Sequence, residues 1–138
     1  ARRQWNLVDN KELDYHYLGD FDHDMLSVLK SEKNINKTAV QEIWHNDGDQ
    51  ILAYMRGDLV FVFNFSPSRS YSDYGFLVPE GAYEVMLNTD SKLYGGNGLA
   101  DDTITHFTNS DKLYAKDHKG WLMLYIPARS AVVLRRKE

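Results

Sequence analysis

The sequence predicts a mainly β protein, an antiparallel β-sandwich preceded by two short helices. The run from Leu59 to Phe65 is rich in apolar, β-branched and aromatic residues, a composition typical of strands. From residue 40 onward, short apolar segments alternate with turn signals built on Gly, Pro, Asp and Ser, as in sandwich domains. Before that point, apolar residues recur with the period of a helix. These three observations define the fold class.

The first third of the chain is expected to form the two helices. Asn10 is a candidate N-cap of the first, and Gly19 stands where a C′ residue would end it. Asp20 is then expected to cap a second helix that ends near residue 30. Apolar residues of this helix repeat at four-residue spacing, at Phe21, Met25 and Leu29. Two short helices cannot form a core alone, so their apolar faces must pack on another surface.

The rest of the chain is expected to consist of strands joined by turns. The expected strands are 40–45, 50–56, 59–65, 71–78, 82–89, 104–108, 121–126 and 130–136. Gly57-Asp58 is a two-residue hairpin signal between the second and third strands, with glycine at a positive φ. This hairpin should form the centre of a sheet. Because 59–65 does not alternate apolar with polar residues, both of its faces should be covered.

Finer patterns predict the surroundings of individual side chains. Alternation in 82–89 places Tyr83, Val85 and Leu87 on one face. The large strand aromatics expected in the core are Tyr83, Trp121 and Tyr125. Residues 93–102 hold several glycines and are expected to form an irregular loop whose backbone needs positive φ angles.

Composition excludes several classes of protein. The chain has 138 residues, no cysteine, and 16 basic against 20 acidic side chains, so disulfides are excluded and nothing favours nucleic acid or an anionic membrane. No apolar run approaches the ~18 residues of a membrane helix. The start of the chain shows no apolar signal segment. We expect a soluble, cytoplasmic protein.

Residues that carry chemistry are not arranged as a recognisable catalytic site. The five histidines lack the spacing of a metal site, and the paired aspartates fall in caps, turns and loops. No catalytic residue, metal site or cofactor is therefore expected. The candidates for a binding role are three aromatics at turns or strand ends, which could stack on sugar rings: Tyr71, Tyr74 and Tyr94.

Six stretches of the sequence carry a resemblance to a known family. They are RRQWNLVDN (2–10), FDHDM (21–25), RGDLVFVFNFSPSRSYSDY (56–74), VPEGAYEVMLNTD (78–90), YGGNG (94–98) and IPARSAVVL (126–134). In this order they make the chain resemble the carboxyl-terminal part of 1,4-α-glucan (glycogen) branching enzymes, members of the α-amylase superfamily. The resemblance covers nearly the whole chain. The first and third stretches are the most specific, whereas the last is shared by many α-amylase relatives.

The resemblance implies a division of the chain into two parts. Residues 1–38 would be the closing helices of a catalytic (β/α)8 barrel, and residues 39–138 an α-amylase-type C-terminal sandwich. The family's retaining transfer of an α-1,4-glucan segment to a 6-hydroxyl needs two carboxylates about 5 Å apart. Those carboxylates belong to barrel motifs without a counterpart here, so the chain alone should be inert. Where the family often has basic residues, this chain has Gly75, Asn97 and Leu99, which puts any role of those basic groups in doubt.

The same resemblance predicts partners. The missing barrel and α-glucan would be the partners of this region. Without the barrel, an apolar patch is expected to lie exposed and to favour self-association; its members are Trp5, Leu7, Leu13, Phe21 and Met25. The alternatives are a stand-alone α-glucan-binding β-sandwich module and a generic interaction domain.

Overall fold

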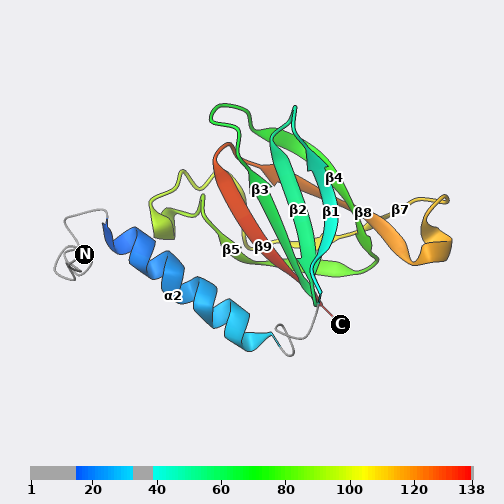
Figure 1. The fold of residues 1–138 in the computed structure, drawn as a ribbon, viewed down its shortest axis with the longest axis horizontal. Helices are drawn as coiled ribbons and strands as arrows, with labels where there is room; N and C mark the ends of the chain where they lie inside the picture. The colour runs from blue at the N-terminus through cyan, green and yellow to red at the C-terminus, as the bar shows by residue number, and fades with distance from the viewer. Residues whose placement is uncertain (1–14, 33–38, 138) are drawn as a thin grey trace.

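The computed structural model describes residues 15–32 and 39–137. In these ranges one α-helix precedes two antiparallel sheets (Figure 1). The predicted mainly β, antiparallel fold is therefore confirmed.

The helix α2 (Tyr15–Ser31) runs without interruption through Gly19 and Asp20. The predicted break between two helices at this point is therefore wrong. Glycine inside a helix costs about 1 kcal/mol relative to alanine, and a helix of 17 residues packed on a sheet tolerates that cost. Asn10 and Leu13, expected in the first helix, lie outside the described residues.

The larger sheet contains the predicted hairpin. Its six strands follow the order β1-β2-β3-β9-β5-β6. Their bounds are β1 (Gln41–Asn46), β2 (Ile51–Arg56), β3 (Leu59–Asn64), β9 (Ser130–Lys137), β5 (Ala82–Asn88) and β6 (Thr105–Phe107). Arg56 pairs with Leu59 across the turn, and Gly57 has a φ of 62°. Since β3 lies between β2 and β9, the central position of the hairpin is confirmed.

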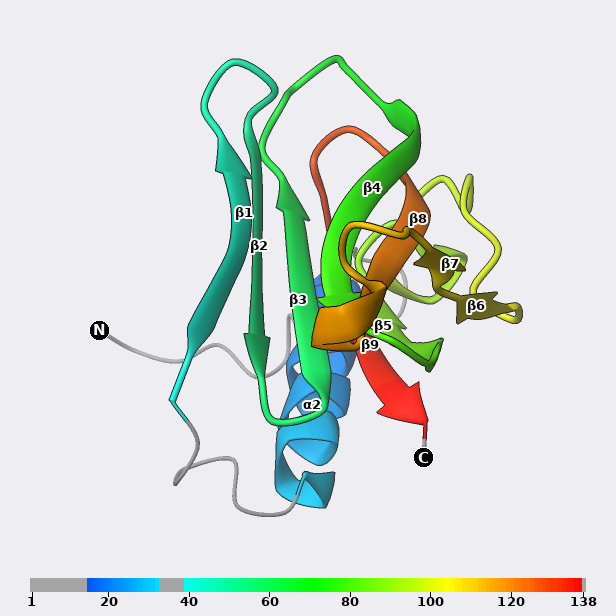
Figure 2. The ribbon, with the colours of Figure 1, turned by 90° about the vertical axis from the view of Figure 1, so that its right-hand side faces the viewer.

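The smaller sheet has the order β4-β8-β7 (Figure 2). Its strands are β4 (Tyr71–Pro79), β8 (Lys119–Ile126) and β7 (Asn109–Ser110), and two 3₁₀ turns lie in the connections, η2 (Lys92–Tyr94) and η3 (Ala115–Asp117). Strand β7 and the two 3₁₀ turns are missing from the sequence prediction, because elements of two or three residues leave no periodic signal.

One hydrophobic cluster joins the two sheets. Its fully buried members come from β2, β3, β5 and β9 of one sheet and from β4 and β8 of the other. Tyr83 belongs to it as predicted, and its hydroxyl donates a hydrogen bond to the Pro79 carbonyl at 2.7 Å. The sheets therefore share a core between their facing sides.

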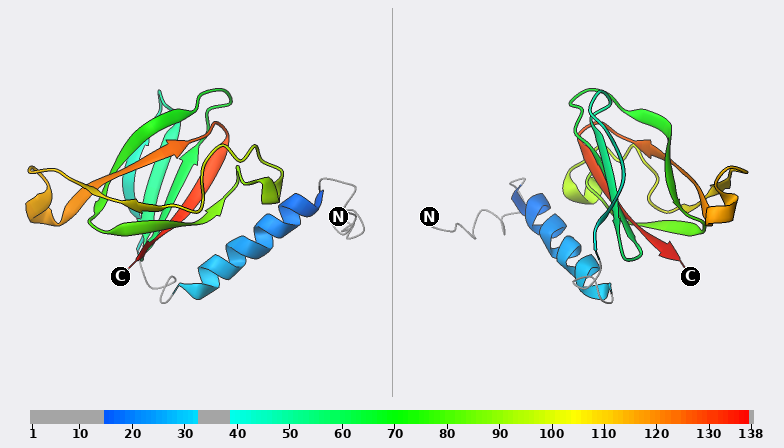
Figure 3. Two further views of the ribbon diagram at one scale, coloured as in Figure 1. Left: turned by 180° about the vertical axis from the view of Figure 1, so that it is seen from behind. Right: turned by 45° about the vertical axis from the view of Figure 1, so that its right-hand side comes forward.

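A second cluster lies on the outer face of the larger sheet, where α2 packs. Figure 3 shows α2 on the opposite side of this sheet from β4 and β8. In β3, Val60 and Val62 point into the first cluster, whereas Leu59 and Phe61 point into the second. The prediction that this strand is covered on both faces is confirmed, and the outer cover is a helix.

Three predicted side-chain positions differ from the structure. A register shift between Val85 and Leu87 inserts an extra residue into β5, so Leu87 turns to the outer cluster instead of sharing the face of Tyr83. In β8, the even-numbered residues face the core. Trp121 is consequently only half-buried, and Tyr125 is 39% exposed.

The middle and the end of α2 are tied to the β region. Near its middle, the Tyr94 hydroxyl donates a hydrogen bond to the Asp24 carboxylate, and the Tyr94 ring meets Phe21 edge to face at 5.2 Å. Just past its last residue, the Glu32 carboxylate lies 3.5 Å from Nε of Arg135 on β9. The same carboxylate accepts a 3.3 Å hydrogen bond from the backbone N–H of Asp58 in the central hairpin. The helix is thus held by polar contacts as well as by its apolar face.

Candidate functional site

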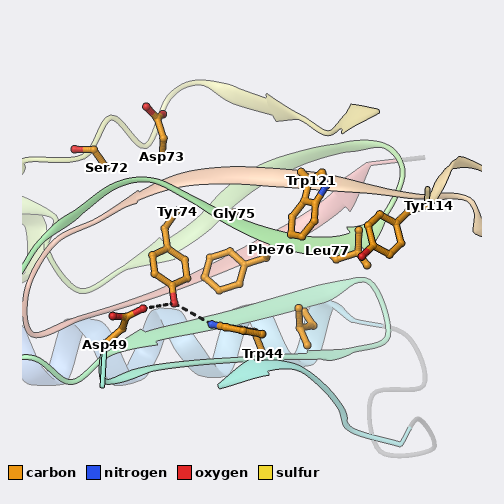
Figure 4. Close-up of a pocket in the computed structure, with 11 residues that line it drawn as sticks. Trp44, Asp49, Ser72, Asp73, Tyr74, Gly75, Phe76, Leu77, Tyr114 and Trp121 are labelled. Carbon is orange, nitrogen blue, oxygen red and sulfur yellow. Dashed lines mark hydrogen bonds between the residues drawn. The ribbon is translucent and has the colours of Figure 1, made fainter. Parts of the chain in front are cut away.

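A groove opens between β1, the edge strand of the larger sheet, and β4, the edge strand of the smaller one. Its volume is about 580 Å³. Aromatic and acidic side chains dominate its lining (Figure 4), which consists of Ile43, Trp44, Asp49, Ser72, Asp73, Tyr74, Gly75, Phe76, Leu77, Tyr114 and Trp121. We call this feature the aromatic groove.

A hydrogen-bonded chain fixes one wall of the aromatic groove. The Tyr74 hydroxyl accepts a bond from Trp44 Nε1 at 2.9 Å and donates one to Asp49 Oδ2 at 3.0 Å. Burial raises the pKa of Tyr74, the bond to Asp49 raises it further, and the bond from Trp44 lowers it. Tyr74 therefore stays protonated at neutral pH and can bridge the indole to the carboxylate.

A backbone irregularity in β4 shapes the rim. The pairing of β4 with β8 shifts register between Tyr71 and Tyr74. The two intervening residues, Ser72 and Asp73, have exposed side chains, and Asp73 has a φ of 50°. Such left-handed residues are uncommon outside glycine, although aspartate is enriched among them. The bulge leaves the backbone of Asp73 without a ladder partner at the rim, and its carboxylate points away from the Tyr74 ring (Figure 4).

Trp121 and Tyr114 form the far end of the aromatic groove. Trp121 Nε1 donates to Asp111 Oδ2 at 3.2 Å, and its ring meets the ring of Tyr114 edge to face at 5.8 Å. Across the strand pair, a Cβ on Gly75 would lie 3.4 Å from the Trp121 ring and 3.0 Å from the sulfur of Met123. The absence of a side chain at Gly75 therefore leaves room for both neighbours.

Of the three tyrosines predicted to contact sugar, two lie together and the third lies elsewhere. Tyr74 lines the aromatic groove. Tyr71 lies behind it, with ring centroids 5.4 Å apart, and donates its hydroxyl to the Asp49 carbonyl at 2.8 Å. Tyr94 is used elsewhere, between η2 and α2. Contact of these residues with a glucan remains a prediction.

Sequence reasoning missed the two tryptophans of the aromatic groove. Trp44 lies on an edge strand and is 45% exposed, while Trp121 has the outward parity of β8. The polar residues after Trp44 indicate a turn and therefore an exposed tryptophan, and an exposed aromatic near a turn is a candidate for binding. The parity of β8 carried no such signal, because its apolar run does not alternate.

The glycine-rich loop after β5 is organised by Asp90. The Asp90 carboxylate is buried and accepts the backbone N–H groups of Asn97 at 3.2 Å and Leu99 at 2.9 Å. The positive φ predicted for this loop is confirmed at Gly95 and Gly98. Both Asn97 and Leu99 have exposed side chains, so their backbone groups hold the loop, and a basic side chain at either position is not needed for it.

No group of three or more His, Asp or Glu side chains that could hold a metal ion occurs in residues 15–32 and 39–137. Over the same ranges, no helix combines the length and apolar character required to cross a membrane.

Known proteins resemble this chain along its whole length. The family of the α-amylase C-terminal all-β domain matches residues 43–137. The chain is 37% identical over 139 residues to a 1,4-α-glucan-branching enzyme of Saccharomyces cerevisiae, covering 100% of this chain and 20% of that protein. A Rhizophagus irregularis protein of the same name is 35% identical over 136 residues, covering 97% of this chain and 20% of the relative. The chloroplastic/amyloplastic protein of this name from Oryza sativa subsp. japonica is 39% identical over 114 residues, covering 80% of this chain and 14% of the relative.

The matches cover only one part of each relative. The chain spans about a fifth of the length of the curated relatives it matches. Because the family matched is a C-terminal all-β domain, the chain corresponds to the carboxyl-terminal part of branching enzymes.

Proposed function

The chain belongs to the family of the α-amylase C-terminal all-β domain, and from this we propose that it is a non-catalytic part of a 1,4-α-glucan branching enzyme. The longer protein would transfer an α-1,4-glucan segment to a 6-hydroxyl and so form α-1,6 branches in glycogen. The observation that carries this proposal is identity of 33–39% to proteins of that name, over 80–100% of this chain.

We place the chemistry outside this chain. A retaining glycosyl transfer uses a nucleophilic carboxylate and an acid/base carboxylate about 5 Å apart. The relatives are about five times longer than the chain, which leaves ample sequence for a catalytic barrel. In this proposal, residues 1–38 close that barrel and residues 39–138 form a β-sandwich of the α-amylase C-terminal type.

The role proposed for the chain is to brace the barrel. The outer face of the larger sheet supports this role, because α2 covers only part of it. Phe65 continues this face by stacking on Phe63 at 5.7 Å, and it is 61% exposed. On α2, Leu26 is 56% exposed. The proposed occupant of this surface is the catalytic barrel of the same protein, since α2 would be its closing helix.

The apolar patch expected from the sequence requires a correction at two positions. Phe21 and Met25 are half-buried between α2 and the sheet, so the β region itself provides partners for them. Trp5, Leu7 and Leu13 lie outside the described residues. Self-association through the remaining apolar surface stays a proposal, and sedimentation of the chain at several concentrations would test it.

The experiment that tests the function uses the longer protein and this chain in parallel. Each is incubated with amylose, and new α-1,6 linkages are counted by proton NMR. The longer protein should form α-1,6 linkages, and the chain alone should form none. A longer protein that leaves amylose unbranched would contradict the proposal, as would branching by the chain alone.

A second candidate function is a stand-alone α-glucan-binding module, which the aromatic groove favours. An open reading frame that encodes no catalytic barrel would support it over the first. We place either protein in the cytoplasm, on the grounds of its composition, although one relative is named for the plastid. Fractionation of cells followed by immunodetection would test this location.

A further inference from the structure

We propose that the aromatic groove binds a linear α-1,4-glucan. The groove chemistry alone indicates a neutral oligosaccharide, and the α-1,4 linkage rests on the proposed function. Its volume of about 580 Å³ falls within the range of ~300–1,000 Å³ typical of small-molecule sites.

The aromatic residues offer surfaces suited to sugar rings. Trp44 is 45% exposed at the mouth of the groove, and Trp121 and Tyr114 are half-buried at its far end. The C–H face of a pyranose is apolar and flat, and it packs on aromatic faces. Both indole N–H groups are already bonded within the protein, to Tyr74 and Asp111. The ring faces are therefore what the tryptophans present to a ligand.

The charges of the lining select a neutral polyhydroxyl ligand. Asp49 supplies carboxylate oxygens within the groove (Figure 4), and these are strong acceptors for hydroxyl donors. Among the described residues that line the groove, none is Lys, Arg or His. A phosphate or an acidic peptide would meet uncompensated negative charge, whereas glucose hydroxyls would find acceptors.

The wall of the groove is already ordered. Tyr74 links Trp44 to Asp49 through bonds of 2.9 and 3.0 Å, and Gly75 leaves space for the Trp121 ring beside it. Side chains fixed before binding lose less conformational entropy when a ligand arrives. This matters for a sugar, because each ring contact contributes little net free energy.

The bulge in β4 argues against a peptide as the occupant. Because β4 is an edge strand, an extended peptide could in principle add to it. However, the register shift at Ser72 and Asp73, with the positive φ of Asp73, interrupts the row of backbone groups that such a peptide would need. A glucan has no such requirement.

Calorimetric titration of this chain with maltoheptaose tests the inference. Trp44→Ala and Trp121→Ala should each weaken binding by about tenfold or more, or 1.4 kcal/mol. Phe107→Ala is the control, because Phe107 is 72% exposed and lies outside the groove lining; it should leave affinity unchanged within about twofold. Near-ultraviolet circular dichroism verifies that each variant is folded. Trp44→Ala also removes the hydrogen bond to Tyr74, whereas Trp121→Ala leaves that bond in place, so the second variant tests ring contact without disturbing Tyr74.

Three results would overturn the inference. The first is the absence of binding heat with maltoheptaose. The second is that the tryptophan variants bind maltoheptaose as tightly as the unaltered chain does, and the third is that the chain binds cellohexaose, whose linkages are β-1,4, as tightly as maltoheptaose. The NMR branching assay of the longer protein separates this inference from the proposed function. Branching without groove binding would overturn only the groove assignment, and groove binding without branching would overturn only the enzyme assignment.

Discussion

At the scale of single residues, close contacts and burial explain why particular side chains occupy particular positions. A Cβ on Gly96 would lie 2.2 Å from the Asp90 carbonyl oxygen, which is far inside the distance that non-bonded atoms reach. Only glycine therefore allows the loop to close over Asp90. The loop then presents its N–H groups to the Asp90 carboxylate.

Gly96→Ala is accordingly expected to lower the free energy of unfolding by about 2–4 kcal/mol, because backbone must move to admit the methyl group. Gly48→Ala is the matched control. Its Cβ would meet only the Asn46 side-chain oxygen, at 3.3 Å, and the expected change is within about 1 kcal/mol. Urea denaturation measures both, and equal losses in the two variants would contradict the account.

The raised pKa of Tyr83 predicts that the free energy of unfolding falls at alkaline pH. Burial raises the pKa of Tyr83 from 10.0 to about 12 in the folded state. Its contribution is therefore fully present below pH 10 and is lost as the pH rises from about 10 to about 12, for a total of about 2–3 kcal/mol. In Tyr83→Phe, which loses about 1 kcal/mol at neutral pH with the hydrogen bond to Pro79, the decline over this range should be shallower. Denaturation curves measured between pH 8 and 12 test this, and parallel declines would refute it.

The same residues show what a sequence can predict at this scale. Alternation placed Tyr83 in the core correctly. It failed for Trp121 and Tyr125, because β8 is apolar at successive positions and either parity could have faced inward. It failed for Leu87 because the bulge in β5 depends on its pairing with β9, which no local pattern contains.

At the scale of elements, the packing of α2 on the larger sheet explains why the helix is continuous. The expected break at Gly19-Asp20 followed from local propensity. Packing of the helix on the larger sheet outweighs that propensity. Helix periodicity itself was read correctly from Phe21, Met25 and Leu29.

Tyr94→Phe should loosen the middle of α2, because it removes the hydroxyl that donates to Asp24 while it keeps the ring against Phe21. The expected cost is about 1–2 kcal/mol in local stability, seen as faster amide hydrogen exchange in residues 20–26. Tyr125→Phe makes the same chemical change at an exposed position and should leave exchange in α2 unaltered. If Tyr94→Phe also leaves it unaltered, the hydroxyl contact does not anchor the helix.

At the scale of the whole molecule, the fold class and central hairpin follow from sequence, whereas the aromatic groove does not. The groove combines residues from the β1 region, β4 and β8, which are far apart in the chain. Each strand is recognisable from its own residues. Only the order of strands in the two sheets brings Trp44 and Trp121 to one opening, and that order depends on pairings between distant segments.

We propose different partners for different faces of the molecule: the catalytic barrel for α2 and the outer face of the larger sheet, and glucan for the aromatic groove. Oxidative footprinting of side chains, in this chain and in the longer protein, tests this assignment most directly. Leu26 and Phe65 are exposed by 56% and 61% in the chain, and they should become protected from hydroxyl radicals in the longer protein. Trp44 should be oxidised equally in both. Unchanged oxidation of Leu26 and Phe65 in the longer protein would contradict the account.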